Sequence, residues 1–72
     1  MRALPEAMRL ELAEVDELLS GAELRLKALK DLGEYEGLPA RVVQRIQRKG
    51  TVLASTREQL AEIPEMVAGG SR

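Results

Sequence analysis

The stretch DLGEYEGLPARVV, residues 31 to 43, decides the fold because it has the composition of one helix end followed by another helix start. Gly33 follows Leu32 as a C-terminal stop, and Pro39 suits the first turn of the next helix. The intervening residues 33–37, GEYEG, form a connection of the length that joins antiparallel helices. The stretch therefore predicts a helical hairpin.

The chain before this turn has the apolar spacing of a coiled-coil helix. Pro5 suits a first helical turn, and Glu6 suits the positive end of the helix dipole. The pattern predicts a helix over about residues 5–32. Its apolar positions recur at steps of mostly three and four residues, and they are Met8, Leu12, Val15, Leu19, Ala22, Leu26 and Leu29.

The chain after the turn predicts a second helix over about residues 39–63, which Pro64 closes. Residues 1–64 then form an all-α, antiparallel hairpin domain of two long helices. Residues 65–72 end in Gly-Gly-Ser-Arg and are expected to form a flexible C-terminal tail. The apolar side of the second helix is expected to contain Val42, Val43, Ile46, Gly50, Leu53, Leu60 and Ala61.

Two glycines interrupt the helical patterns, Gly21 in the first helix and Gly50 in the second. The first pattern stays in phase through Gly21, which favours a continuous helix. A break of the second helix near Gly50 stays open, because a basic turn followed by glycine is typical of a helix end. Both glycines are expected at one level of the hairpin, together with Ala22. This small-residue layer predicts either a close approach of the helices or a groove for a partner's side chain.

Composition restricts how so short a chain is stabilised. Its 72 residues include no Cys and no His, which excludes disulfides and most metal sites. Association is the remaining support for a small core. The net charge of −1 conceals an asymmetry: residues 1–23 have six acids and two bases, whereas residues 24–49 have seven bases and three acids. No apolar run is long enough to span a bilayer, and the absence of Cys is compatible with a reducing cytosol, so we expect a cytoplasmic protein.

Catalysis is not expected from this chain. Without His or Cys, no nucleophile has an evident base beside it. The sequence has no phosphate-binding glycine loop of the Gly-x-x-x-x-Gly-Lys or Gly-x-Gly type. No cofactor, metal or small-molecule ligand is therefore predicted.

The first helix has more apolar surface than one neighbouring helix covers, which predicts a partner. Tyr35, the only aromatic residue, either caps the last layer over Leu32 or Leu38 or anchors a partner at the hairpin tip. The partner is either a second copy, which completes a four-helix bundle as a homodimer, or a larger protein. We therefore expect a small accessory, regulatory or assembly protein. The predicted partner-binding residues are Leu10, Leu18, Leu24, Ala28, Leu32 and Tyr35.

The alternative function is nucleic-acid binding by a basic face of the second helix. Its residues are Arg41, Arg45, Arg48 and Lys49. Arginines spaced in this way reach several phosphates from one side of a helix. The competing interpretation is an ordinary solvated face, because the chain as a whole is acidic and has no aromatic row for stacking on bases.

Two short stretches are similar to known families. TREQLAEI, residues 56–63, resembles the opening helix of winged helix-turn-helix regulators, which implies a helix over residues 39–49, a turn at Gly50 and a second helix after it. LPARVVQRIQRKGTVL, residues 38–53, resembles the small subunit of exonuclease VII, a helical hairpin that coats a larger catalytic subunit. The second resemblance implies docking on a larger protein.

Overall fold

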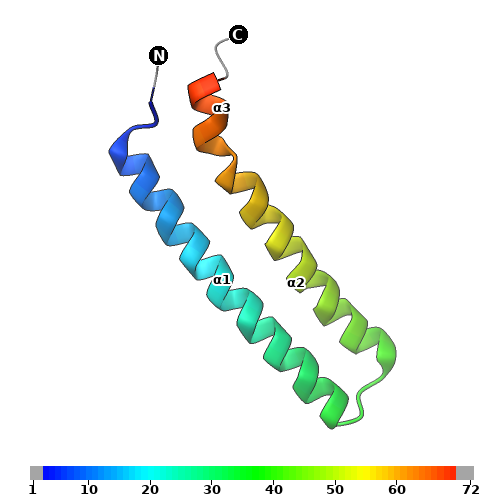
Figure 1. Ribbon diagram of the computed structural model, residues 1–72. Coiled ribbons are helices and arrows are strands. Elements are labelled where there is room, and N and C mark those ends of the chain that lie inside the picture. Colours follow the sequence, from blue (N-terminus) through cyan, green and yellow to red (C-terminus); the bar gives the residue numbers. More distant parts are fainter. Residues whose placement is uncertain (1–2, 70–72) are drawn as a thin grey trace.

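The chain folds as a hairpin of two long antiparallel helices (Figure 1). In the computed structural model, which describes residues 3–69, α1 spans Glu6–Tyr35, α2 spans Ala40–Ala61 and a short α3 spans Ile63–Gly69. Of this part of the chain, 88% is helical and none is strand. The predicted all-α helical hairpin is confirmed.

The turn between α1 and α2 is closed by Gly37. The Leu38 N–H donates to the Gly33 carbonyl over 3.0 Å, and the Gly37 N–H donates to the Glu34 carbonyl over 3.1 Å. With Gly37 at a φ of 76°, these bonds form the Schellman motif of helix C-termini. Gly37 therefore ends α1, and the prediction that the helix stops at Gly33 is wrong.

Gly33 lies inside α1 and is buried against the start of α2. A Cβ atom on Gly33 would lie 3.4 Å from Cδ1 of Leu38 and 3.5 Å from Cγ2 of Val43. Leu38 precedes the N-cap residue Pro39 and Val43 follows it by four, which is the spacing of a hydrophobic staple. The missing side chain at Gly33 thus lets the staple of α2 pack closely on the last turns of α1.

Both long helices begin after a Leu-Pro pair. Pro5 and Pro39 are the N-cap residues, each with a φ of −56° and an extended ψ of 146° and 144° respectively. Proline holds φ near this value but does not itself continue the helix here. The first helical residues are therefore Glu6 and Ala40, each one position after its proline.

Neither Gly21 nor Gly50 breaks its helix. The break near Gly50 that the sequence left open is absent, and with it the helix-turn-helix alternative. A glycine in a helix costs only about 1 kcal/mol relative to alanine, which packing along the rest of the helix offsets. No atom lies within 4 Å of a Cβ built on either glycine, so the expected close approach of the helices is also wrong.

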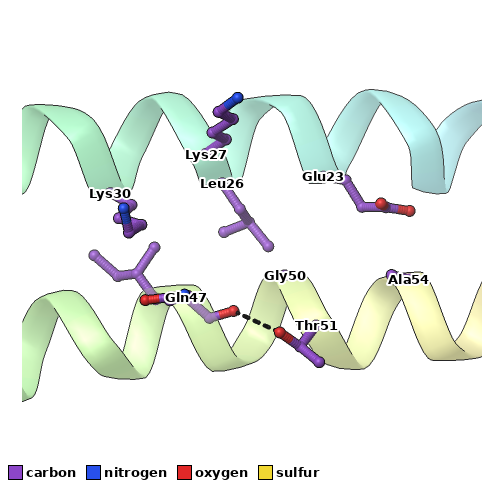
Figure 2. Close-up of a pocket in the computed structure, with 9 residues that line it drawn as sticks. Glu23, Leu26, Lys27, Lys30, Gln47, Gly50, Thr51 and Ala54 are labelled. Carbon is purple, nitrogen blue, oxygen red and sulfur yellow. Dashed lines mark hydrogen bonds between the residues drawn. The ribbon is translucent and has the colours of Figure 1, made fainter.

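The two glycines do not lie opposite each other because the turn is centred on Leu38 and not on Tyr35. Leu26, not Gly21, points toward Gly50 (Figure 2). Gly21 is exposed on the outside of α1. The small-residue layer predicted from the sequence therefore does not form.

The predicted C-terminal tail is partly helical. Pro64 has no N–H to continue α2, but it is well suited to the first turn of α3. The Met66 N–H donates to the Glu62 carbonyl over 2.9 Å and closes that turn. Residues 65–69 thus extend the rod, whereas residues 70–72 of the expected tail lie outside the described part of the chain.

The hairpin is thin and long, with principal extents of 55 × 22 × 9 Å. Its radius of gyration is 16.6 Å, whereas a compact domain of this length has about 11 Å. Within residues 3–69, the only buried hydrophobic side chains are Leu4 and Val43, each 7% exposed. No helix in this range combines the length and apolar character needed to cross a membrane.

Candidate functional site

One broad side of the hairpin contains an open groove with charged and polar side chains along it (Figure 2). The groove has a volume of about 360 Å³ and runs between α1 and α2. Leu26 and Gly50 lie near its middle, and the missing side chain of Gly50 helps to keep it open. Its rim is mostly charged or polar, formed by Glu23, Lys27 and Lys30 of α1 and by Gln47 and Thr51 of α2. We call this side the polar face.

The opposite broad side combines exposed apolar side chains with charged ones. Helical periodicity places Leu18, Leu29 and Leu32 on the flank of α1 that lies away from Lys27. The same geometry places Val42 and Val52 on the flank of α2 that lies away from Gln47 and Thr51. All five side chains are exposed, with Leu18 at 69% and Val52 at 55%. We call the surface formed by Leu18, Leu29, Leu32, Val42 and Val52 the apolar face.

The predicted partner-binding residues divide between two surfaces. Leu18 and Leu32 belong to the apolar face. The other four predicted residues are exposed on the side of α1 that is turned away from α2, and we call this side the outer edge. They are Leu10, Leu24, Ala28 and Tyr35. The structure therefore brings only part of the predicted set onto a surface shared by both helices.

Tyr35 is the last residue of α1, at the turn end of the rod. Its side chain is 85% exposed, so the ring does not cover Leu32 or Leu38. The interpretation of Tyr35 as a cap on the last core layer is therefore wrong. Leu38 instead packs over Gly33, as the close approach at that glycine requires.

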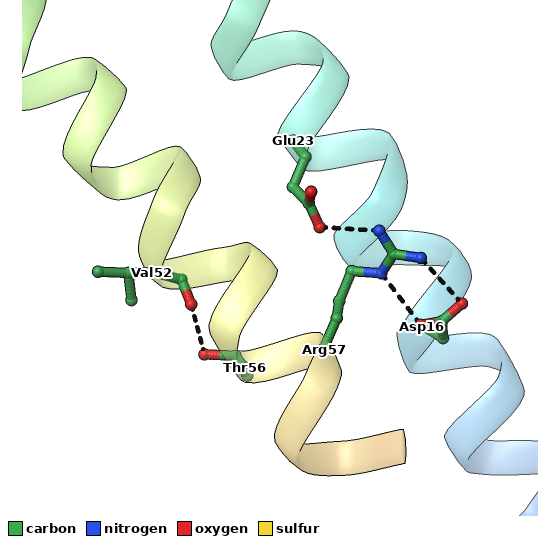
Figure 3. A network of polar contacts seen from close by, with 5 residues as sticks. All are labelled: Asp16, Glu23, Val52, Thr56 and Arg57. Carbon is green, nitrogen blue, oxygen red and sulfur yellow. Dashed lines mark hydrogen bonds and ion pairs between the residues drawn. The ribbon is translucent and has the colours of Figure 1, made fainter. Parts of the chain in front are cut away.

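A partly exposed ion-pair cluster joins α2 to α1 (Figure 3). Arg57 of α2 donates from Nε to Oδ1 of Asp16 over 3.0 Å and from Nη1 to Oε2 of Glu23 over 3.0 Å. Asp16 and Glu23 are two helical turns apart on one side of α1, so one guanidinium spans both. The Arg57 side chain is only a third exposed.

The same contacts determine the charge state of Arg57. Hydrogen bonding to Asp16 first, and to Glu23 second, raises the pKa of the guanidinium above its ordinary value. Partial desolvation opposes this shift, and the Coulomb attraction of the two carboxylates adds to it. Arg57 therefore stays positively charged wherever the two carboxylates are ionised.

Sequence reasoning missed Arg57 because it assigned only apolar positions of the second helix to the contact with the first helix. The signal was present: Arg57 lies four residues after Leu53 and three before Leu60, at an interface position. It also missed that Met8 and Leu29 are each 48% exposed rather than facing α2. At the level of Leu29, the position toward α2 is taken by Lys30, because a straight helix drifts relative to a strict heptad.

The basic residues of the second helix lie together on one stripe of α2, and we call Arg41, Arg45, Arg48 and Lys49 the basic row. Three of them line a concavity of about 440 Å³ together with Val52. None of the four takes part in an ion pair within residues 3–69. Their charges are therefore not neutralised by other side chains of the described chain.

Within the described range, no group of three or more acidic, His or Cys side chains converges as a metal site would require. Comparison of the chain with protein-family models, with curated proteins and with solved structures found no match.

Proposed function

We propose that this chain is a non-enzymatic protein-protein interaction module of the cytoplasm, a small accessory, regulatory or assembly protein that acts through its apolar face. One observation carries the proposal. Within residues 3–69, eleven large hydrophobic side chains are exposed, whereas only Leu4 and Val43 are buried. A monomer that exposes half of its large apolar side chains leaves much of the available hydrophobic stabilisation unused.

The arrangement of the exposed side chains supports this proposal. Single exposed leucines are common in proteins, but a contiguous apolar patch on a small protein is typical of an interaction site. The five residues of the apolar face lie on one side of the hairpin and on both helices. Covering such a surface contributes about 25 cal/mol for each Å² removed from water. A helical partner that lies along the two helices would cover the face over much of its length.

The absence of catalysis is part of the proposal and rests on chemistry. The sequence has no His and no Cys, the residues that most often act as base or nucleophile at neutral pH. The one charged cluster that joins the two helices consists of Arg57 with Asp16 and Glu23. Its groups are engaged with one another, which fits a structural role.

The experiment compares two variants that introduce the same side chain on opposite faces. Tagged wild type, Leu29→Glu and Thr51→Glu are each used to capture proteins from the native host, and bound species are identified by mass spectrometry. We expect an identified protein that is retained by the wild type and by Thr51→Glu but lost with Leu29→Glu. If no bound species depends on Leu29, and the purified chain is also monomeric, the proposal is contradicted.

Nucleic-acid binding is the second candidate, and the basic row favours it. Arg41, Arg45, Arg48 and Lys49 have no ion-pair partner in the described chain and lie on one stripe of α2. Phosphate contacts by such a row weaken steeply as salt is raised. Retention on mixed-sequence duplex at low salt that is lost at moderate salt, and lost in Arg45→Gln with Arg48→Gln, would support this function. No retention at low salt would contradict it.

A further inference from the structure

The two ends of the folded hairpin differ in net charge. Because the hairpin folds at Gly37, residues 24–49 form its turn end, with seven bases and three acids. Residues 3–23 lead away to the opposite end, with six acids and one base. Figure 1 shows this opposite end, where the start of α1 and α3 lie near each other. The rod is thus basic at the turn and acidic at the open end.

We propose that the apolar face is covered by a second copy of this chain, placed antiparallel, so that the basic turn end of each copy lies over the acidic open end of the other. The two hairpins then form a four-helix bundle with two-fold symmetry. This inference rests on the proposed function and names its partner. It differs from docking on a foreign protein in requiring only the purified chain.

The α1 residues of the apolar face belong to a second line of packing positions along that helix. α2 already packs along one line, which includes Leu19 and Leu26. A neighbouring line has the steps of four and three that a second helix requires. Its members are Glu11, Val15, Leu18, Ala22, Arg25, Leu29 and Leu32. Val15 and Ala22 on this line are half-buried, whereas the remaining positions are exposed. A helix with two adjacent packing lines has the pattern of a bundle member rather than of an isolated hairpin.

The orientation follows from charge. An antiparallel pair places the basic turn end of one copy over the partner's acidic open end, where four of the six acids are not engaged by Arg57. A parallel pair would place bases over bases and acids over acids, which costs free energy through repulsion. Opposite charges at the two ends also orient the copies during encounter.

The exposed area fits a second copy. The chain exposes 6067 Å², more than a third above the value of about 4,400 Å² for a compact protein of its mass. A standard interface removes about 800 Å² from each partner. Each hairpin can therefore lose that area and still expose more surface than a compact monomer.

The test uses the absence of cysteine, which allows one spin label to be placed at a chosen residue. The mass of the wild type is measured by sedimentation equilibrium at micromolar concentration, and the distance between two labels on Tyr35→Cys is measured by pulsed electron paramagnetic resonance. We expect a dimer whose two labels are about 40 Å apart. The two-fold axis passes near the middle of α1, and the 1.5 Å rise per residue places each Tyr35 about 20 Å from that axis, on opposite sides of it. Labels less than about half as far apart would show a parallel pair and overturn the proposed arrangement.

Two variants locate the interface. Leu29→Glu places a carboxylate on the apolar face, opposite the acidic end of the partner, and is expected to weaken dimerisation at least about tenfold. Thr51→Glu makes the same addition on the polar face and is expected to leave the dimer intact. A dimer that is lost with Thr51→Glu and kept with Leu29→Glu would place the interface on the polar face and overturn the proposal. A monomeric wild type overturns the second-copy inference, whereas the proposed function is contradicted only if, in addition, no captured protein depends on Leu29.

Discussion

The Arg57 side chain donates a hydrogen bond to the carboxylate of Asp16 over 3.0 Å, although 41 positions of the sequence separate the two residues. Arg57 also donates a hydrogen bond to the carboxylate of Glu23. Within residues 3–69, the hydrogen bonds of Arg57 to Asp16 and Glu23 are the only polar side-chain contacts between α1 and α2. Apolar side chains slide past one another with little directional preference, whereas a guanidinium held by two carboxylates has one preferred geometry. We infer that this cluster selects the axial register of the hairpin.

We expect Arg57→Ala to lower the melting temperature of the hairpin, and Asp16→Ala to have a smaller effect in the Arg57→Ala background than in the wild type. Thermal unfolding followed by circular dichroism measures both, as a double-mutant cycle. Added salt should reduce the difference between wild type and Arg57→Ala, because the cluster is partly exposed. Strictly additive effects would show that the contact does not contribute.

The pH dependence of this contribution follows from the raised pKa of Arg57. A cation whose pKa is higher in the folded state contributes stability below its unfolded pKa and loses it only as pH rises through the folded pKa. For arginine this loss lies far above neutral pH. The effect of Arg57→Ala on the melting temperature should therefore be the same at neutral and at mildly alkaline pH.

Gly37→Ala is expected to destabilise the hairpin by about 1 kcal/mol, because Gly37 has a φ of 76° that an alanine adopts only with strain. Gly21→Ala is the matched control. Gly21 is exposed inside α1 with no atom near the added Cβ, so this change should stabilise by up to about 1 kcal/mol. Urea unfolding measures both, and a change of the same sign in the two variants would contradict the assigned turn.

Gly50→Ala is expected to raise the free energy of unfolding by about 1 kcal/mol, because the added methyl group points into the open groove and the helix gains propensity. Gly33→Val is expected to lower it by about 1–3 kcal/mol. A Cβ at Gly33 already touches Leu38 and Val43, and the further methyl groups have no room. Equal effects would mean that the two glycines do not differ in packing as the structure shows.

Val43→Ala should cost about 2 kcal/mol, because Val43 is one of the two buried hydrophobic side chains of the described chain. Leu24→Ala removes more atoms but lies on the exposed outer edge, so its cost should stay below about 0.5 kcal/mol. Denaturant unfolding at one fixed protein concentration compares them. A larger cost at Leu24 would show that the outer edge is covered in solution.

Tyr35→Ala is expected to change the free energy of unfolding by less than about 0.5 kcal/mol, because its ring is 85% exposed. Binding to a captured partner should be measured in parallel. Reduced affinity with unchanged stability would identify Tyr35 as an anchor at the turn end. Reduced stability alone would contradict both the observed exposure and the anchor role.

Most of the secondary structure could be predicted because it depends on neighbours a few residues apart. The apolar spacing of α1, the prolines before both long helices and the glycine-rich turn each act locally, through propensity, φ restriction and backbone hydrogen bonding. The helical stretch after Pro64 was missed, because proline both ends one helix and suits the first turn of another.

The sequence by itself determined that two long helices fold back on each other. It also determined that residues 1–23 are acidic, that residues 24–49 are basic, and that the first helix has more apolar surface than one neighbouring helix covers. Only the tertiary structure decided which glycine ends α1, that Leu26 lies opposite Gly50, and that Arg57 enters the helix interface. It also divided the exposed leucines between the apolar face and the outer edge. These features depend on how α1 is rotated and shifted relative to α2. The small difference between the helical repeat and the heptad repeat accumulates over the 30 residues of α1. Contacts between residues that are distant in sequence then determine which side of α1 faces α2.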